Sequence, residues 1–424
     1  MKENSYGLKE RKKRIIILTA DSGFGHRSAA NAMAAALKQK HAGECEVTIL
    51  NPIEDRRTPA FLRDSAADYD RLVRSAPDLY RFGYKASDSE VPSFLIESLL
   101  TVAMYEIMRD TVRDLNPDAI VTTYPLYQAP LNSYFIINRY RVPLITVVTD
   151  LASVHRMWFS PNVEFCLVPT PEVQQLALKN GLAASKIHIT GVPVSPAFAT
   201  NKKSKEEIRK GLGWDPHLPT FLVVGSRRVD RLVESLNVLN HFGSPLQVAA
   251  IAGKDEEILA HLNNIKWHIP AYVFDFVDNM SDLMMASDAI ICKAGGLIVT
   301  ESLACGLPML LIDVIPGQEE GNRDYVLQNG AGVMVESSMQ MLETLAHWMA
   351  DDGLVLKQHA QNSCRVGRSN SAYDAVDLIW QAALRGPVNK RGKPGTRRTS
   401  LIELLTRNNI PLGDVLKVKT KQPD

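Results

Sequence analysis

The chain has 424 residues, of which 45% are hydrophobic and 22% charged, which excludes a largely disordered, collagen-like or integral membrane protein and suits about two soluble domains. Lysine and arginine together number 48 against 47 for aspartate and glutamate, but the excess of basic residues lies at the two ends, so the middle is acidic. A core that binds many phosphates of a nucleic acid would itself be basic, and we therefore expect no nucleic-acid partner.

The first residues argue against export. They lack the apolar run of a signal peptide, and no stretch of about 18 uncharged apolar residues is present to span a bilayer. The five cysteines are scattered and never spaced as CxxC, which predicts free, mostly buried thiols in a reducing compartment. These features favour a cytoplasmic protein whose residues 1–13 are a basic extension.

The first half of the chain alternates apolar strands with helices. From residue 14 the sequence RIIILTA predicts a buried strand, which a glycine turn connects to an alanine-rich helix over 28–39. Further strands are predicted at 45–50, 119–124, 143–150 and 164–169. Near-continuous apolar strands flanked by helices are typical of a parallel sheet covered on both faces, so residues 14–200 are predicted to form one α/β domain.

The second half repeats this pattern. Prolines and then a basic segment at 190–207 indicate a linker. A second α/β domain is predicted over 201–385, with strands at 220–225, 246–253, 271–277, 289–294 and 308–313. Residues 386–424 are basic and rich in Gly and Pro without periodicity, which predicts a disordered tail, with one short amphipathic stretch at 401–406.

One glycine-rich turn carries the sharpest chemical signal. The sequence KAGGLIVTE from Lys293 places Gly295 and Gly296 where a buried strand passes into a helix, and bare backbone N–H groups at a positive helix end suit a diphosphate. Glu301, one helical turn further, can accept two hydrogen bonds from ribose hydroxyls. A tight turn followed by a solvated glutamate has the same sequence, so the motif alone leaves both interpretations open.

Polar residues follow other strands at the same carboxyl edge, where open parallel sheets bind ligands. His26, in the turn DSGFGH, can act as a general base or can simply begin a helix. Asp150, clustered with His155 and Trp158, can orient or relay a proton or can cap the segment that follows. The loop at 316–322 (PGQEEGN) suits a polyhydroxylated ligand, although a solvated loop has the same composition.

Five motifs together resemble a known family. SGFGHRSAA, VVTDLASVHRMW, VPTPEV with TGVPVSPAF, FVDNMSDLMMASDAIICKAGGLIVTESLACGLPML and PGQEEGN, in this order, are similar to the monogalactosyldiacylglycerol synthase and processive diacylglycerol glucosyltransferase family, and more distantly to the muramyl-pathway N-acetylglucosaminyltransferase. The resemblance covers about residues 14–385. It implies a GT-B fold, in which two Rossmann-like domains face a cleft, with the donor on the C-terminal domain and the acceptor on the N-terminal domain.

The resemblance also implies the reaction and its residues. An inverting hexosyltransferase would move galactose or glucose from a UDP-sugar to the hydroxyl of diacylglycerol, without a cofactor or a bound metal. His26 would be the base or the acceptor-orienting group, and Asp150 is the second catalytic candidate. The residues implied to bind the donor are Gly295, Gly296, Leu297, Glu301, Phe276, Val277, Met280, Gln318, Glu319, Asn322, Gly225 and Arg227.

A lipid acceptor requires contact with a membrane. Residues 56–109 mix aromatic and aliphatic side chains with repeated arginines, a composition that binds anionic interfaces and is equally that of a helical subdomain with a solvated face. The resemblance favours a peripheral enzyme on the inner face of the cell membrane. Its expected partners are a UDP-sugar, diacylglycerol or another lipid acceptor, and an anionic membrane surface.

Two departures from the family keep other interpretations open. Phe24 stands in a loop where the family usually has glycine, and Arg227 and Arg228 follow Gly225 where relatives commonly have more glycines. The same fold and donor site serve transferases to non-lipid acceptors and UDP-sugar 2-epimerases. A non-catalytic UDP-sugar-binding sensor is the alternative from another functional class.

Overall fold

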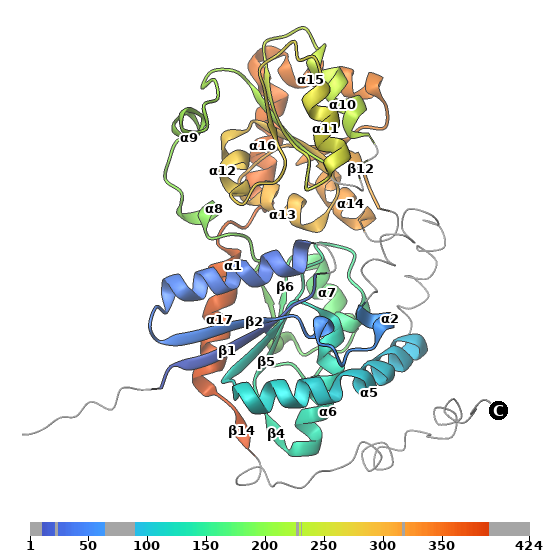
Figure 1. Cartoon of the computed structure of the whole chain (residues 1–424), viewed down its shortest axis with the longest axis vertical. Coiled ribbons are helices and arrows are strands. Elements are labelled where there is room, and N and C mark those ends of the chain that lie inside the picture. Colours follow the sequence, from blue (N-terminus) through green and yellow to red (C-terminus); the bar gives the residue numbers. More distant parts are fainter. Residues whose placement is uncertain are drawn as a thin grey trace, which may run out of the picture.

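The computed structural model describes residues 11–21, 24–63, 90–225, 229, 231–315 and 319–389. They form two α/β domains, each built on a six-stranded parallel sheet. In Figure 1 the N-terminal domain lies below and the C-terminal domain above, with α13 and α1 near the junction between them. The predicted pair of parallel α/β domains is confirmed.

The N-terminal sheet has the order β2-β1-β3-β5-β6-β7. Its strands are β1 Lys13–Leu18, β2 Cys45–Leu50, β3 Ala119–Thr122, β5 Leu144–Val147, β6 Phe165–Val168 and β7 Ile187–Ile189. Its helices are α1 Phe24–Lys40, α2 Ala60–Arg63, α5 Glu90–Leu115, α6 Gln128–Asn138 and α7 Pro171–Lys179, with short 3₁₀ turns at Pro52–Glu54, Pro125–Tyr127, Arg156–Trp158 and Ala184–Lys186. Every residue of β3, β5 and β6 is buried, because helices cover both faces of the sheet.

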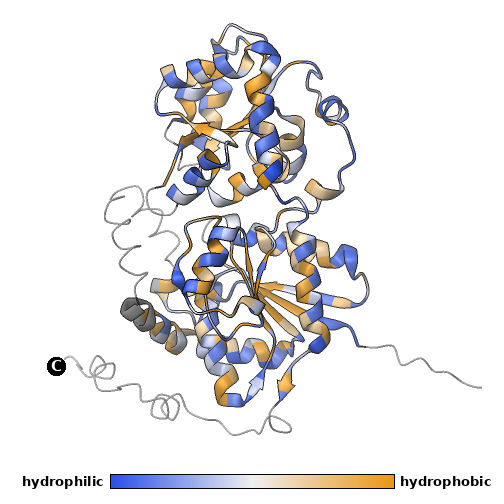
Figure 2. Cartoon of the chain, turned by 180° about the vertical axis from the view of Figure 1, so that it is seen from behind, coloured by the Kyte–Doolittle hydropathy of each residue, from blue (hydrophilic) through white to orange (hydrophobic). Residues whose placement is uncertain are grey.

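The C-terminal sheet has the order β10-β9-β8-β11-β12-β13. Its strands are β8 Thr220–Val224, β9 Gln247–Ile251, β10 Ala271–Phe274, β11 Ala289–Lys293, β12 Met309–Asp313 and β13 Gly332–Met334. Its helices are α8 Ala197–Thr200, α9 Lys205–Leu212, α10 Leu232–Asn240, α11 Glu256–Asn264, α12 Met280–Ala286, α13 Gly296–Ala304, α14 Glu320–Gln328, α15 Ser338–Met349 and α16 Leu354–Val366, with a 3₁₀ turn at Asp351–Gly353. Figure 2 shows mainly hydrophobic strands between helices of mixed hydropathy in both domains.

The last helix returns to the first domain. Helix α17 (Ser371–Arg385) packs beside α1, and its Ala375 and Ile379 share a buried core with Ile15 of β1 and Val121 of β3. The sequence predicted that residues 201–385 would belong to the second domain. Packing instead assigns α17 to the N-terminal domain, since its apolar face covers that sheet.

The chain therefore crosses between the domains twice. At the first crossing the backbone N–H of Val194 donates to Ser371 Oγ, which lies 3.1 Å away in the second crossing. Gly191 has a φ of +85°, and a methyl group built on it would lie 2.9 Å from the Arg368 side chain. Because the two crossings touch, any relative motion of the domains must bend both together.

The end of the described chain corrects one prediction. Strand β14 (Val388–Asn389) pairs antiparallel with β4 (Tyr140–Arg141), so the first residues of the tail predicted to be disordered are part of a small sheet. The partner strand is remote in sequence, and for this reason composition alone did not reveal it. Residues 390–424, including the stretch at 401–406, lie outside the described residues, as do residues 1–10.

The described helices and the five cysteines bear on the membrane and redox expectations. Among the described residues, no helix combines the length and the apolar composition needed to cross a bilayer. All five cysteines are free, as predicted, but only Cys166 and Cys292 are fully buried, while Cys364 is exposed.

The packing of α17 can be tested by truncating one side chain. Ile379 is buried between α17 and the N-terminal sheet, so Ile379→Ala is expected to lower the free energy of unfolding by about 2–5 kcal/mol through lost burial and a residual cavity. Leu384→Ala is the matched control on the same helix, because Leu384 is 55% exposed, and it should change stability by about 0.5 kcal/mol or less. Urea unfolding measures both, and equal effects of the two substitutions would contradict the assigned packing.

Candidate functional site

Some of the residues singled out in the sequence lie where the two domains touch. Thr149 follows β5 of the first domain, and Gly296 begins α13 of the second. A methyl group built on Gly296 would lie 3.5 Å from the Thr149 carbonyl oxygen, and one built on Gly321 would lie 2.2 Å from Ser153 Oγ. The first distance is an ordinary van der Waals contact, whereas the second shows that only glycine fits at position 321, where the carboxyl edges of the two domains meet.

His26 stands in the first turn of α1, held by the other strands of its domain. Its Nδ1 lies 2.8 Å from Thr149 Oγ1, its backbone carbonyl accepts a hydrogen bond from Thr123 Oγ1 at 3.1 Å, and its ring meets Tyr124 edge-on at 5.1 Å. Burial lowers the pKa of His26 to about 4, so the imidazole is neutral near pH 7. Thr149 engages Nδ1, and a hydrogen bond between the ring and the Thr123 backbone opposes the effect of burial on this pKa.

The loop before His26 is closed by an ion pair. Arg27 donates two hydrogen bonds to the carboxylate of Asp21, at 2.7 and 2.8 Å, and Asn51 Nδ2 donates to the same carboxylate at 3.1 Å. The hydrogen bond from Arg27 is the main cause that lowers the pKa of Asp21. These contacts connect both ends of the turn, residues 21 and 27, and fix the start of α1.

Asp150 lies in the cluster that the sequence proposed. Its Oδ2 accepts a hydrogen bond from Trp158 Nε1 at 2.9 Å, and the Trp158 ring lies 6.1 Å from the His26 ring, centre to centre. Burial raises the pKa of Asp150 to about 6, against the opposing effect of the Trp158 hydrogen bond. His155 has a different role, because its Nδ1 accepts the N–H of Met157 and caps the 3₁₀ turn.

Helix α13 begins without a side-chain cap. Its N-cap, Gly295, donates its own N–H to the Lys293 carbonyl at 2.8 Å, so the N–H groups that point out of the helix end are those of Gly296, Leu297 and Ile298. In contrast, side chains cap α7, α9, α11 and α15: Thr170, Ser204, Asp255 and Ser337. The start of α13 is therefore suited to an anionic ligand.

Glu301 is a buried carboxyl group on the second turn of α13. Glu301 is 7% exposed. Its carboxyl group has no hydrogen-bond partner among the described residues. Burial raises the pKa of Glu301 to about 8. Since buried polar groups are normally satisfied, this carboxyl group is well placed to receive hydroxyl groups of a ligand.

Residues at the start of α14 contact the glycine turn and hold it in place. Glu319 pairs with the ammonium group of Lys293 and accepts the N–H of Ile315 at 3.0 Å. Asn322 Nδ2 donates to the Ala294 carbonyl at 3.0 Å. Glu319 and Asn322, expected from the sequence to contact a ligand, are thus next to the turn and engaged with it, while Gln318 lies outside the described residues.

The other residues predicted to bind the donor also belong to the C-terminal domain. Phe276 follows β10 and is exposed, and the Lys254 ammonium group lies 4.0 Å above its ring centre, while Val277 and Met280 pack against the core beneath. Gly225 ends β8, where a methyl group would lie 2.6 Å from the Leu232 side chain and 2.9 Å from the Ile251 carbonyl oxygen. Arg227 is outside the described residues.

The sequence missed two residues of this site. Thr149 stood only within the motif VVTDLASVHRMW, next to Asp150, and Lys293 only as the first residue of the glycine motif. Their partners, His26 and Glu319, lie 123 and 26 residues away along the chain. No local sequence pattern predicts such contacts. The one available signal is position, because Thr149 follows a strand and Lys293 ends one at the carboxyl edge of a sheet, where ligands bind.

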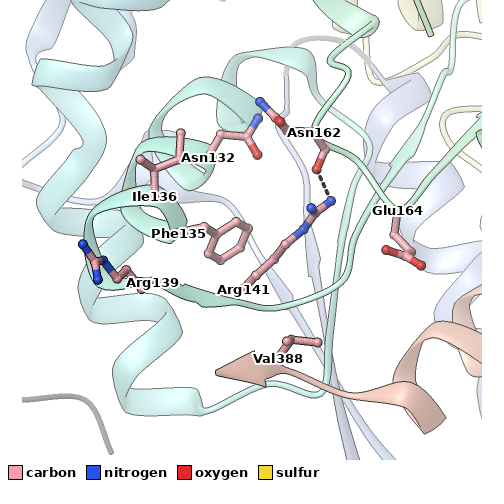
Figure 3. Close-up of a pocket in the computed structure, with 8 residues that line it drawn as sticks. All are labelled: Asn132, Phe135, Ile136, Arg139, Arg141, Asn162, Glu164 and Val388. Carbon is pink, nitrogen blue, oxygen red and sulfur yellow. Dashed lines mark hydrogen bonds between the residues drawn. The ribbon is translucent and has the colours of Figure 1, made fainter. Parts of the chain in front are cut away.

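A separate pocket lies at the opposite end of the N-terminal sheet. Its volume is about 410 Å³, and it is lined by Asn132, Phe135, Ile136, Arg139, Arg141, Asn162, Glu164 and Val388. Figure 3 shows Arg141 reaching toward the carbonyl oxygen of Asn162, to which it donates a hydrogen bond at 2.7 Å. Since Asn162 and Glu164 precede β6, this pocket is at the amino edge and contains none of the predicted site residues.

The segment predicted to face a membrane, 56–109, is described only in part, because 64–89 lie outside the described residues. Two of its described arginines pair with acidic neighbours: Arg57 contacts Asp55 at 2.9 Å and Asp110 at 2.7 Å, and Arg109 contacts Asp110 at 3.0 Å. On α5, the apolar side chains of Leu99 and Val102 are exposed. In this part of the segment, exposed apolar surface is therefore clearer than free positive charge.

Comparison with known proteins places this geometry in a family. Residues 26–194 match the model of monogalactosyldiacylglycerol (MGDG) synthase, and residues 220–379 match that of the glycosyltransferase family 28 C-terminal domain. A probable monogalactosyldiacylglycerol synthase, chloroplastic, of Glycine max is 33% identical over 383 residues, covering 87% of this chain and 71% of its own. The monogalactosyldiacylglycerol synthase, chloroplastic, of Spinacia oleracea is 33% identical over 384 residues, with 87% and 72% covered.

A solved structure supports the fold. MurG of Acinetobacter baumannii superimposes with a TM-score of 0.57 at 17% identity, covering 88% of this chain and 100% of its own. At this identity the similarity concerns the architecture alone. Two parallel α/β domains that meet at their carboxyl edges are the GT-B arrangement, as the sequence predicted.

The buried His26 predicts a pH dependence of stability. Its pKa of about 4 in the folded chain is below the ordinary value of 6.5, so the unfolded chain binds a proton first, and stability is lost as the pH falls from 6.5 toward 4. Between pH 7 and pH 5 the wild type should lose about 1–2 kcal/mol more than His26→Gln. Urea unfolding at both pH values measures the difference.

A matched control for this measurement is His217→Gln, because His217 is exposed. The His217→Gln variant should follow the wild type at both pH values. If His26→Gln also followed the wild type, the neutral state assigned to His26 would be wrong.

Proposed function

The chain belongs to the monogalactosyldiacylglycerol synthase family, and we propose that this glycosyltransferase moves a hexose from a UDP-sugar to the hydroxyl group of diacylglycerol and so makes a membrane glycolipid. The observation that carries the proposal is the contact of Gly296 with Thr149. It brings an uncapped helix end beside a buried, neutral histidine. A leaving diphosphate and an acceptor hydroxyl group need those two partners at one place.

The donor is assigned to the C-terminal domain. The N–H groups of Gly296 and Leu297, at the positive end of α13, bind the diphosphate and stabilise the negative charge that develops as UDP leaves. Glu301 accepts hydrogen bonds from the ribose hydroxyls, which satisfies its buried carboxyl group. Phe276, with Val277 and Met280 behind it, borders the uracil ring.

The acceptor is assigned to the N-terminal domain. His26 takes the proton of the acceptor hydroxyl group as the new bond to the anomeric carbon forms and the bond to the diphosphate breaks, which inverts the configuration. The hydrogen bond to Thr149 supports this role, because it orients the ring. The lowered pKa keeps the His26 imidazole neutral and so able to accept a proton, although it also makes His26 a weaker base than an ordinary histidine.

Asp150 is the second candidate for the base. Its pKa is raised to about 6, which is close to the value that a general base at neutral pH requires, and the Trp158 hydrogen bond holds its carboxyl group in place. His26 is preferred because it hydrogen-bonds Thr149, whose carbonyl oxygen lies beside Gly296 of the donor domain. Asp150 is then a neighbour that shapes the field around His26.

We also propose that the enzyme works as a peripheral protein on the inner face of the cell membrane. Diacylglycerol resides in the bilayer, so the acceptor site has to reach it. Leu99 and Val102, exposed on α5 of the acceptor domain, support contact with the apolar part of the interface. An anionic surface is the proposed partner of the basic residues in 56–109.

The reaction is tested by measuring UDP release from UDP-galactose and UDP-glucose, each with and without diacylglycerol in mixed micelles, with thin-layer separation of the lipids. We expect release from one donor that depends on diacylglycerol and yields a glycolipid. His26→Ala should keep UDP affinity while turnover falls by about 100-fold or more. UDP binding without release under any lipid condition would overturn the proposed reaction, and full turnover by His26→Ala would assign the base elsewhere, to Asp150 first.

The ribose contact predicts that UDP binding depends on pH. The pKa of Glu301 is raised to about 8 in the free protein, whereas hydroxyl donors favour the ionised carboxylate. Binding therefore releases a proton below pH 8, and affinity should rise by up to about tenfold per pH unit between pH 7 and 8 and then level off. Calorimetric titration with UDP measures this profile.

Glu301→Gln separates the ribose contact from the titration of UDP itself. This variant should bind UDP more weakly at pH 8 and show a flat profile over the same range. Glu343→Gln, on the exposed face of α15, should match the wild type. If Glu301→Gln retained both the affinity and the slope, the ribose assignment would be wrong.

A further inference from the structure

Lys293, the last residue of β11, is a charged group of the donor domain with no role so far. Its side chain is 18% exposed, and its ammonium group pairs with Glu319. The pairing register between β11 and β12 shifts between Cys292 and Lys293, so the strand is irregular at this residue. Lys293 is therefore a cation held at the carboxyl edge of the donor sheet, at the entrance to the glycine turn.

The ammonium group lies against the glycine turn itself. A methyl group built on Gly295 would lie 3.0 Å from Lys293 Nζ and 3.6 Å from its Cε. Gly295 directly precedes α13, whose first N–H groups have no side-chain cap. An anion that binds this helix end consequently meets the Lys293 ammonium group as well.

Glu319 is arranged to hold Lys293. One carboxylate oxygen of Glu319 pairs with the ammonium group, and the other accepts the N–H of Ile315 at 3.0 Å. Its side chain is buried, so its oxygen atoms are directed to these two protein groups. Both carboxylate oxygens of Glu319 are therefore engaged. Lys293 has donors to spare, because an ammonium group carries three N–H groups, and it can direct one of them toward a ligand.

We propose that Lys293 binds the diphosphate of the UDP-sugar donor and stabilises the charge on departing UDP, with Glu319 as the residue that positions it. This inference rests on the proposed function. The role is electrostatic: the proton of the acceptor goes to the base, the bond to the anomeric carbon breaks toward UDP, and no bond to Lys293 forms or breaks. A charge-assisted hydrogen bond to a phosphate is stronger than a neutral one, so Lys293 adds to what the amide groups of α13 supply.

Calorimetric titration of the full chain with uridine, UMP and UDP tests the proposal. The wild type should bind UDP more tightly than UMP and uridine, because the phosphates supply the contact. Lys293→Met, which keeps the length of the side chain and removes its charge, should bind UDP about tenfold or more weakly and bind uridine within about twofold of the wild type. Lys293→Arg, which keeps the charge, should retain most of the affinity for UDP.

A second variant guards against a folding defect. Removing Lys293 alone leaves the buried Glu319 carboxylate unpaired, which is strongly destabilising. The double variant Lys293→Met with Glu319→Gln removes both charges, and it should show the same selective loss of UDP affinity. Circular dichroism and the retained binding of uridine report that the variants are folded.

The possible results distinguish a failure of the Lys293 inference from a failure of the proposed function. If the wild type binds UDP and both variants bind it equally well, Lys293 has no part in phosphate binding and this inference fails alone. If uridine and UDP lose affinity equally, the effect of Lys293 is structural and the inference is again wrong. If the wild type binds none of the three compounds, the proposed function fails and the inference fails with it.

Discussion

The close approach of the two domains is the constraint on which the site depends. A methyl group built on Gly296 would be in ordinary van der Waals contact with the Thr149 carbonyl oxygen, and at Gly321 a methyl group would overlap Ser153. Through this approach the start of α13 and the start of α1, which belong to different sheets, become parts of one site. The paired crossings near Val194 and Ser371 connect the domains behind it, so the approach is a property of the whole fold.

Burial then determines the charge of the groups that the approach brings together. Desolvation lowers the pKa of His26 and raises the pKa values of Asp150 and Glu301, so each group is moved toward its neutral form. Lys293 and Glu319 neutralise each other. Near pH 7 and without a ligand, His26 and Glu301 are mainly neutral, whereas Asp150, with a pKa of about 6, is mainly ionised. The start of α13 keeps its partial positive charge, which the nucleoside diphosphate of the proposed function would meet.

Much of the donor site was predictable because it is local in sequence. The strand, the turn and the helix that carry Gly295, Gly296 and Glu301 lie within a dozen residues, and hydrophobic patterning with glycine indicates such a unit directly. In the acceptor half, the cluster of Asp150 and Trp158 was predicted for the same reason. The contacts of Thr149 with His26 and of Lys293 with Glu319 were not predicted, because they join residues at the carboxyl ends of different strands, or in the segments that follow them, and no short pattern encodes that spacing.

The sequence by itself determined two parallel α/β domains, the glycine turn at the start of α13 that we propose binds an anion, and the polar residues that follow the strands, since these follow from the period of apolar residues and from backbone freedom at glycine. Only the tertiary structure decided that α17 covers the N-terminal sheet, that β14 pairs with β4, and which of the polar groups are engaged within the protein. The physical reason is the same in each case. An apolar helix face or a carboxylate needs a partner, and several partners suit its chemistry equally, so three-dimensional packing makes the choice.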